Sequence, residues 1–174
     1  MADTMKSMTL SDDDWQQLLT RLNEGQIPDE EIGSTIVHLA KPFDSRRAQI
    51  ATPTIVRYLD HPNSWARHEA MWFLRWTGLV NYKTVLIHAL KSDSDADNRG
   101  YAALCLAHLL HGTSDSDAVN ALRAKVMDES EDENVRVNSY GALIEIVTNR
   151  SGGEFFAKFA DSKNFDWDWV STLE

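Results

Sequence analysis

The chain has 174 residues, of which 43% are hydrophobic and 25% charged. These values are ordinary for one folded domain that buries a core. Its 27 acidic residues outnumber 17 lysines and arginines, giving a formal net charge of −10. This balance argues against nucleic-acid binding, which needs basic side chains to neutralise phosphates.

Residues 1–11 contain no apolar stretch typical of a signal peptide, and no run reaches the roughly 18 apolar residues that a membrane span needs. A single cysteine, Cys105, rules out an intramolecular disulfide. We therefore expect a cytoplasmic protein without membrane contact.

The N-terminal region predicts three helices, with apolar residues recurring at a period near 3.6. Ser11 is a good N-cap followed by three aspartates, and Gly25 and Pro28 end the first helix. A second helix begins at Asp29 and ends before Pro42. A third runs over 45–59, where Pro53 is expected to kink it or split it.

An internal repeat follows, in the segments 55–74, 87–106 and 122–143. Each segment has an apolar helix end, an acidic turn, an arginine, a small residue three positions on and a leucine seven positions on. The arginines are Arg67, Arg99 and Arg136, spaced by 32 and 37 residues. Periods of this size are typical of stacked supersecondary units.

This pattern resembles the HEAT-repeat family, in which each unit is a pair of antiparallel helices. The resemblance implies an all-α fold, a short right-handed α-solenoid of stacked helical hairpins within a single domain, 1–174. It divides the chain into a degenerate hairpin at 11–44, repeats at 45–79, 80–112 and 115–150, and a C-terminal cap or tail at 153–174. The third repeat departs from the pattern because Ser139 holds the small position and its turn is longer.

Counting from each arginine, positions plus 3, 6, 7 and 10 form the expected core face of the second helices. The opposite side carries plus 1, 5, 8 and 12, and it is aromatic and aliphatic where a solvated face would be polar. HEAT-like stacks place these helices on the concave surface, so this strip is a candidate binding site. Its predicted partner-binding members are His68, Trp72, Arg75, Leu104, His111 and Ile144.

The turns of the second and third repeats are rich in acids, which predicts an attraction for a basic protein. The residues assigned to this role are Asp93, Asp95, Asp97, Asp128, Glu129, Glu131 and Asp132. Solvation alone also explains such turns, and the sequence leaves both interpretations open.

The C-terminal segment is an alternative occupant of the strip. Residues 153–160 predict one more helix, followed by Phe165, Trp167 and Trp169. This segment either folds over the strip or caps the last unit, leaving the strip for a partner. For each of the six tryptophans, a core position is favoured over an interface position.

No catalytic motif appears, so we expect a protein without enzymatic activity, cofactor or metal. Asp93–Asn98 lacks the later positions of a calcium loop, and Cys105, His108 and His111 drift around their helix rather than converging on zinc. We predict a protein-binding module, in particular an acidic inhibitor or immunity protein that masks a basic partner such as a toxin. The alternatives are a structural or regulatory adaptor and an enzyme similar to HEAT-repeat bilin lyases.

Overall fold

The computed structural model describes residues 10–41, 44–150 and 161–173, and within these ranges it contains helices and no strand. The all-α prediction is confirmed for this part of the chain. Nowhere in it does a helix combine the length and apolarity needed to cross a membrane. The helices are α1 (Asp12–Asn23), α2 (Asp29–Ala40), α3 (Ser45–Ile55), η1 (Val56–Asp60), α4 (Ser64–Thr77), η2 (Val80–Tyr82), α5 (Lys83–Ser92), α6 (Ala96–Leu109), α7 (Ser116–Met127), α8 (Glu133–Thr148), η3 (Ser162–Asn164) and α10 (Trp167–Thr172).

The helices form two compact units, Met1–Phe73 and Leu74–Glu174, and the boundary between them lies inside α4. This boundary also lies inside the predicted repeat 45–79. The two units are therefore described separately.

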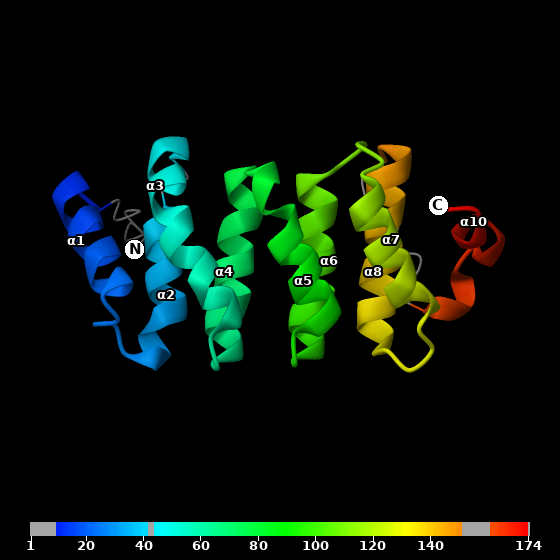
Figure 1. Cartoon of the computed structure of the whole chain (residues 1–174), viewed down its shortest axis with the longest axis horizontal. Helices are drawn as coiled ribbons and strands as arrows, with labels where there is room; N and C mark the ends of the chain where they lie inside the picture. The colour runs from blue at the N-terminus through cyan, green and yellow to red at the C-terminus, as the bar shows by residue number, and fades with distance from the viewer. Residues whose placement is uncertain (1–9, 42–43, 151–160, 174) are drawn as a thin grey trace, which may run out of the picture. The chain divides into compact units, whose positions relative to one another are not determined.

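In the first unit, α1, α2 and α3 pack against one another (Figure 1). Ser11 caps α1 as predicted, because its hydroxyl accepts a hydrogen bond from the Asp14 amide at 3.1 Å. The buried Trp15 donates its indole N–H to the carbonyl of Leu39 at 2.9 Å, which ties α1 to the end of α2. The predicted bounds of the first two helices are thus reproduced closely.

The predicted helix at 45–59 is divided into two helices, but the division lies after Pro53 and not at it. Helix α3 continues to Ile55, two residues beyond the proline, and then tightens into the 3₁₀ helix η1. Proline removes one backbone donor and leaves the carbonyl four residues earlier without that partner. Exposure of Pro53 suits this loss, since water can satisfy the carbonyl.

In the second unit, two hairpins, α5–α6 and α7–α8, pack side by side. Helix α5 contacts α7 and α6 contacts α8, while the members of each hairpin contact each other. The result is two layers, one of first helices and one of second helices (Figure 1). The loop after α6 also bonds to the end of α8, because the amides of Gly112 and Ser114 donate to the carbonyls of Glu145 and Ile146.

The predicted core register is confirmed at positions plus 3, 6 and 7 of all three second helices. All nine side chains are buried: Ala70, Phe73, Leu74, Ala102, Cys105, Leu106, Ser139, Ala142 and Leu143. Position plus 10 is less regular, since Ile146 is buried while Thr77 and Leu109 are half-buried. The arginine register therefore locates the core correctly.

Ser139, at the small position of the third repeat, buries a hydroxyl group that lowers the stability of the fold. Its hydroxyl oxygen is fully enclosed and makes no hydrogen bond within the described structure. A buried polar group without a partner loses its hydration without compensation.

Replacing Ser139 by alanine should therefore stabilise the second unit by about 1 kcal/mol, since alanine removes the unpaired hydroxyl and favours helix. The reciprocal change, Ala102→Ser, places the same hydroxyl at the equivalent buried position of α6 and should destabilise by a similar amount. Urea unfolding followed by circular dichroism measures both. Equal effects of the two substitutions in the same direction would contradict the shared register.

Candidate functional site

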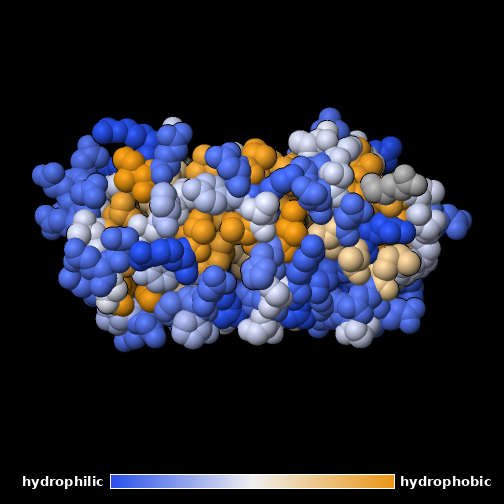
Figure 2. All heavy atoms as spheres, in the orientation of Figure 1, coloured by the Kyte–Doolittle hydropathy of each residue, from blue (hydrophilic) through white to orange (hydrophobic). Residues whose placement is uncertain are grey.

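The acids of the two long turns gather at one end of the second unit. The turn between α5 and α6 carries Asp93 and Asp95, and the turn between α7 and α8 carries Asp128 and Glu129. Because α5 lies beside α7 and α6 beside α8, both turns lie at the same end. Figure 2 shows mostly hydrophilic colour there, along the lower edge of the view. We call this surface the acidic edge, made of Asp93, Asp95, Asp97, Asp128, Glu129 and Asp132.

Local hydrogen bonds fix the shape of the acidic edge. Asp95 caps α6 by accepting from the amides of Asp97 and Asn98, and Asp132 caps α8 by accepting from the amide of Asn134. Asp128 accepts from the hydroxyl and the amide of Ser130, and these bonds lower the pKa of Asp128. These carboxylates thus hold the turns in place.

Asp97, Asp128, Glu129 and Asp132 are exposed, while Asp93 and Asp95 are half-buried. Six of the seven predicted acids are therefore at least partly open to solvent, five in the two turns and Asp97 in the first turn of α6. Whether a partner binds them stays a prediction.

Glu131, the seventh predicted acid, is instead an internal ion-pair partner. Its side chain is only 5% exposed and bonds to Arg99 of α6 and Lys125 of α7. The Arg99 Nε lies 3.1 and 3.2 Å from the two carboxylate oxygens. The expectation that Glu131 is a solvated or partner-binding acid is wrong for this conformation, because the residue joins the two hairpins.

The three repeat arginines also donate hydrogen bonds to backbone carbonyls of the segment that precedes their own helix. Arg67 donates to the carbonyls of His61 and Pro62, Arg99 to that of Asp93, and Arg136 to that of Val126. Carbonyls at a helix end lack intrahelical partners, so each guanidinium closes the turn of its own hairpin. Arg99 additionally pairs with Glu131 of the next hairpin, so this guanidinium also joins the two hairpins of the second unit.

The predicted strip is only partly exposed. His111 is exposed and Leu104 and Arg75 are half-buried, but Ile144 is 5% exposed. Assigning Ile144 to a binding surface is therefore wrong for this conformation. In the first unit, His68 and Trp72 are half-buried.

Packing between second helices explains the difference. Gly100, at position plus 1 of α6, lies so close to α8 that an ideal Cβ would be 2.8 Å from Nδ2 of Asn138 and 3.8 Å from Cα of Val135. This side of α6 therefore meets the neighbouring helix. Exposure is greater around position plus 9, where Trp76 is 50% exposed and its ring centroid lies 5.5 Å from that of His108.

The C-terminal residues pack as a cap on the last hairpin. Tyr140 of α8 stacks on Phe165 with centroids 4.3 Å apart and meets Trp169 edge-on at 5.8 Å. Arg123 of α7 donates to the carbonyl of Val170 at 3.0 Å, and Arg136 lies over Trp167. Neither Tyr140 nor Arg136 belongs to the predicted strip. The helix predicted at 153–160 lies outside the described residues.

The prediction that each tryptophan is a core residue is wrong for three of the six. Trp15 is buried, but Trp65, Trp76 and Trp167 are 53%, 50% and 40% exposed. In the first unit, Trp65 stacks on His68 with ring planes 5° apart. Between Trp65 and Trp72 lies Glu69, which is 6% exposed. Sequence reasoning missed Glu69, although an acid one turn from a tryptophan on either side was a visible signal.

Cys105 is buried in the core of the second unit. Burial raises the pKa of Cys105 to about 12, so this thiol stays protonated and is a poor nucleophile. Within the described ranges, no group of three or more histidine, cysteine or acidic side chains is arranged to hold a metal.

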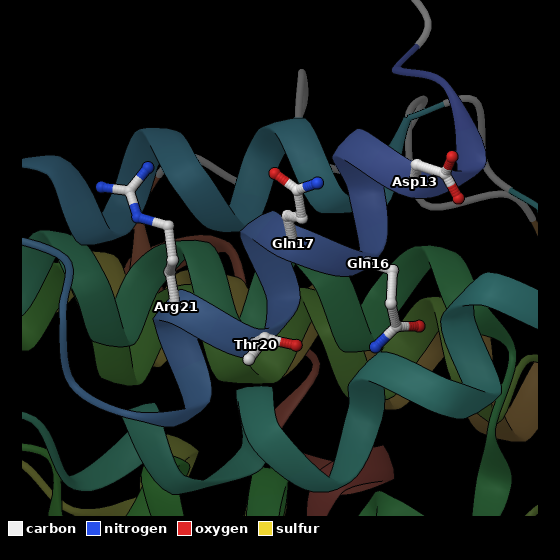
Figure 3. Close-up of a pocket in the computed structure, with 5 residues that line it drawn as sticks. All are labelled: Asp13, Gln16, Gln17, Thr20 and Arg21. Carbon is white, nitrogen blue, oxygen red and sulfur yellow. The ribbon is translucent and has the colours of Figure 1, made fainter.

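A hollow on the first unit is lined by side chains of α1 alone, all of which are solvent-exposed (Figure 3). Its residues are Asp13, Gln16, Gln17, Thr20 and Arg21.

The sequence matches no protein-family model and no curated protein. The resemblance to HEAT repeats therefore depends on the internal repeat alone.

Replacing Glu131 by glutamine should destabilise the second unit by about 2 kcal/mol at pH 7, because Arg99 and Lys125 lose their shared counter-charge. Burial opposes ionisation of Glu131, but hydrogen bonds from Arg99 and Lys125 outweigh it and lower its pKa from 4.5 to about 2. The folded pKa is below the unfolded one, so this stabilisation is present above pH 4.5 and is lost as the pH falls toward 2.

Urea unfolding at pH 7 and at acidic pH measures this effect. The matched control is Glu129→Gln in the same turn, which removes the same charge from an exposed position. Similar losses for the two substitutions, or a Glu131→Gln deficit that does not shrink in acid, would contradict the assigned role.

Proposed function

We propose that this protein is a non-enzymatic protein-binding module with HEAT-like hairpins, and that it acts as an acidic inhibitor or immunity protein masking a basic partner such as a toxin. The observation that carries the proposal is the acidic edge. It places six acids in two adjacent turns and at the start of α6, all in one unit, and four of them are exposed.

The acids of the edge outnumber the bases that pair with their turn. Arg99 and Lys125 share Glu131, and the six acids of the edge add six further negative charges against these two bases. The edge therefore presents a negative potential to solvent. Such a potential accelerates encounter with a positively charged protein and favours it over neutral competitors.

The edge is also organised before any partner arrives. Asp95 and Asp132 cap helices and the Asp128 carboxylate closes its own turn, so their positions are set by the fold. A surface whose groups are already ordered loses less conformational entropy on association. This supports binding of a folded partner with a complementary basic face, in a cytoplasmic setting.

The direct test reverses exposed acids that make no cap. Asp97→Lys with Glu129→Lys changes the formal net charge from −10 to −6, since each reversal adds two charges. Affinity purification identifies the partner, and the dissociation constant is then measured over a salt titration. We expect roughly tenfold weaker binding, mainly from slower association, and a shallower salt dependence.

The control variant, Glu24→Lys with Glu30→Lys, makes the same change of net charge at exposed positions of the first unit. A partner that is neutral or acidic, or an affinity independent of salt, would refute the proposal. Retained affinity in the Asp97 and Glu129 variant would favour the adaptor alternative. Visible absorbance of the purified protein would instead favour a chromophore enzyme of the bilin-lyase type.

A further inference from the structure

Glu69 is an acidic residue in a buried position, where an ionised carboxylate destabilises the fold. It lies in the middle of α4 and is 6% exposed. Within the described structure no side chain or backbone group forms a hydrogen bond or ion pair with it. Burial accordingly raises the pKa of its carboxyl group. A carboxylate that is largely removed from water and has no counter-charge destabilises a fold. A cation that pairs with Glu69 from outside would remove that destabilisation.

The carboxylate of Glu69 remains reachable. The described side-chain polar atoms that are both fully enclosed and without a hydrogen bond are Arg47 Nη1, Arg75 Nε and Ser139 Oγ. The oxygens of Glu69 are absent from this set and make no hydrogen bond with any described residue, so they are not fully enclosed. A cationic group approaching from outside can therefore reach them.

Two tryptophans flank Glu69 on the same face of α4. Trp65 lies four residues before it and Trp72 three residues after it, the spacings that bring helical side chains together. Trp65 is 53% exposed and Trp72 is half-buried. The face of an indole ring attracts cations, and arginine most often fills this role.

The indole of Trp65 has little freedom where it meets α2. An ideal Cβ on Gly33 would lie 2.1 Å from both Cδ1 and Nε1 of Trp65, so the ring edge rests directly on the glycine backbone. On α4 itself, His68 stacks on the ring at 5.9 Å between centroids. The ring is thus positioned by the fold, and its remaining surface is open to solvent.

We propose that Glu69, with Trp65 and Trp72 beside it, receives one arginine side chain of the basic partner. This inference rests on the proposed function, because it supplies a second point of attachment for the same partner. A guanidinium can bond to both carboxylate oxygens while stacking on an indole, which an ammonium group cannot do. Pairing also removes the cost of the isolated carboxylate, so the contact should form a central anchor.

The test titrates the full chain with N-acetylarginine amide and follows the tryptophan indole N–H signals by NMR, assigned with Trp65→Phe and Trp72→Phe. We expect saturable shifts of both indole signals and weaker binding of N-acetyllysine amide. Glu69→Gln should weaken arginine binding at least fivefold, whereas Glu31→Gln, an exposed acid on α2, should leave it unchanged. Glu69→Gln removes a buried unpaired charge, so it is expected to fold.

Gly33→Ala provides a second variant, because its methyl group displaces the Trp65 ring without altering any charge. It too should weaken arginine binding, and saturating arginine should lower the pKa of Glu69 in the parent protein. Absence of indole shifts, or equal binding by Glu69→Gln, would overturn the arginine site. The proposed function fails separately: if no basic protein is captured while arginine amide binds, the site stands and the partner assignment falls.

Discussion

The buried ion pair of Glu131 with Arg99 and Lys125 is the contact on which the second unit depends. Arg99 lies in the first turn of α6, Lys125 lies in the last turn of α7, and Glu131 lies in the turn before α8, so three elements meet at one carboxylate. Removing the shared carboxylate would leave two bases close together without their counter-charge, which is strongly destabilising. This pair attaches the turn before α8 to α6 and α7, while local caps and the Asp128–Ser130 bonds order the acidic edge itself.

The ends of the helices and their core faces could be predicted because they depend on local rules. Ser11, Asp29 and the glycine and proline signals set bounds through capping and backbone chemistry, which act within a few residues. The arginine register gave the nine core positions because helical periodicity fixes which residues share a face. Ser139 at a small position was visible in the sequence, but its unpaired hydroxyl was not.

The exposed surface could not be predicted in the same way, because exposure depends on neighbouring elements. Ile144 and Gly100 lie on the side of their helices opposite the predicted core face, which was expected to be exposed. Both are buried, and Gly100 contacts α8 directly. Glu131 stands in a run of six residues with five acids, and nothing local separates it from Glu129, which is exposed. Only the three-dimensional pairing of turns identifies which carboxylate is internal.

The order in which the chain is made gives the Arg99 contact a further meaning. Its acceptor, Glu131, lies 32 residues later, so at synthesis rates of 5–20 residues per second the guanidinium emerges about 2–6 s before its partner. During that interval a charged group stays well hydrated, whereas an apolar surface awaiting its neighbour would invite association with other chains. Because this contact between successive hairpins is a salt bridge, the Arg99 guanidinium can stay hydrated in the nascent chain until Glu131 has been synthesised.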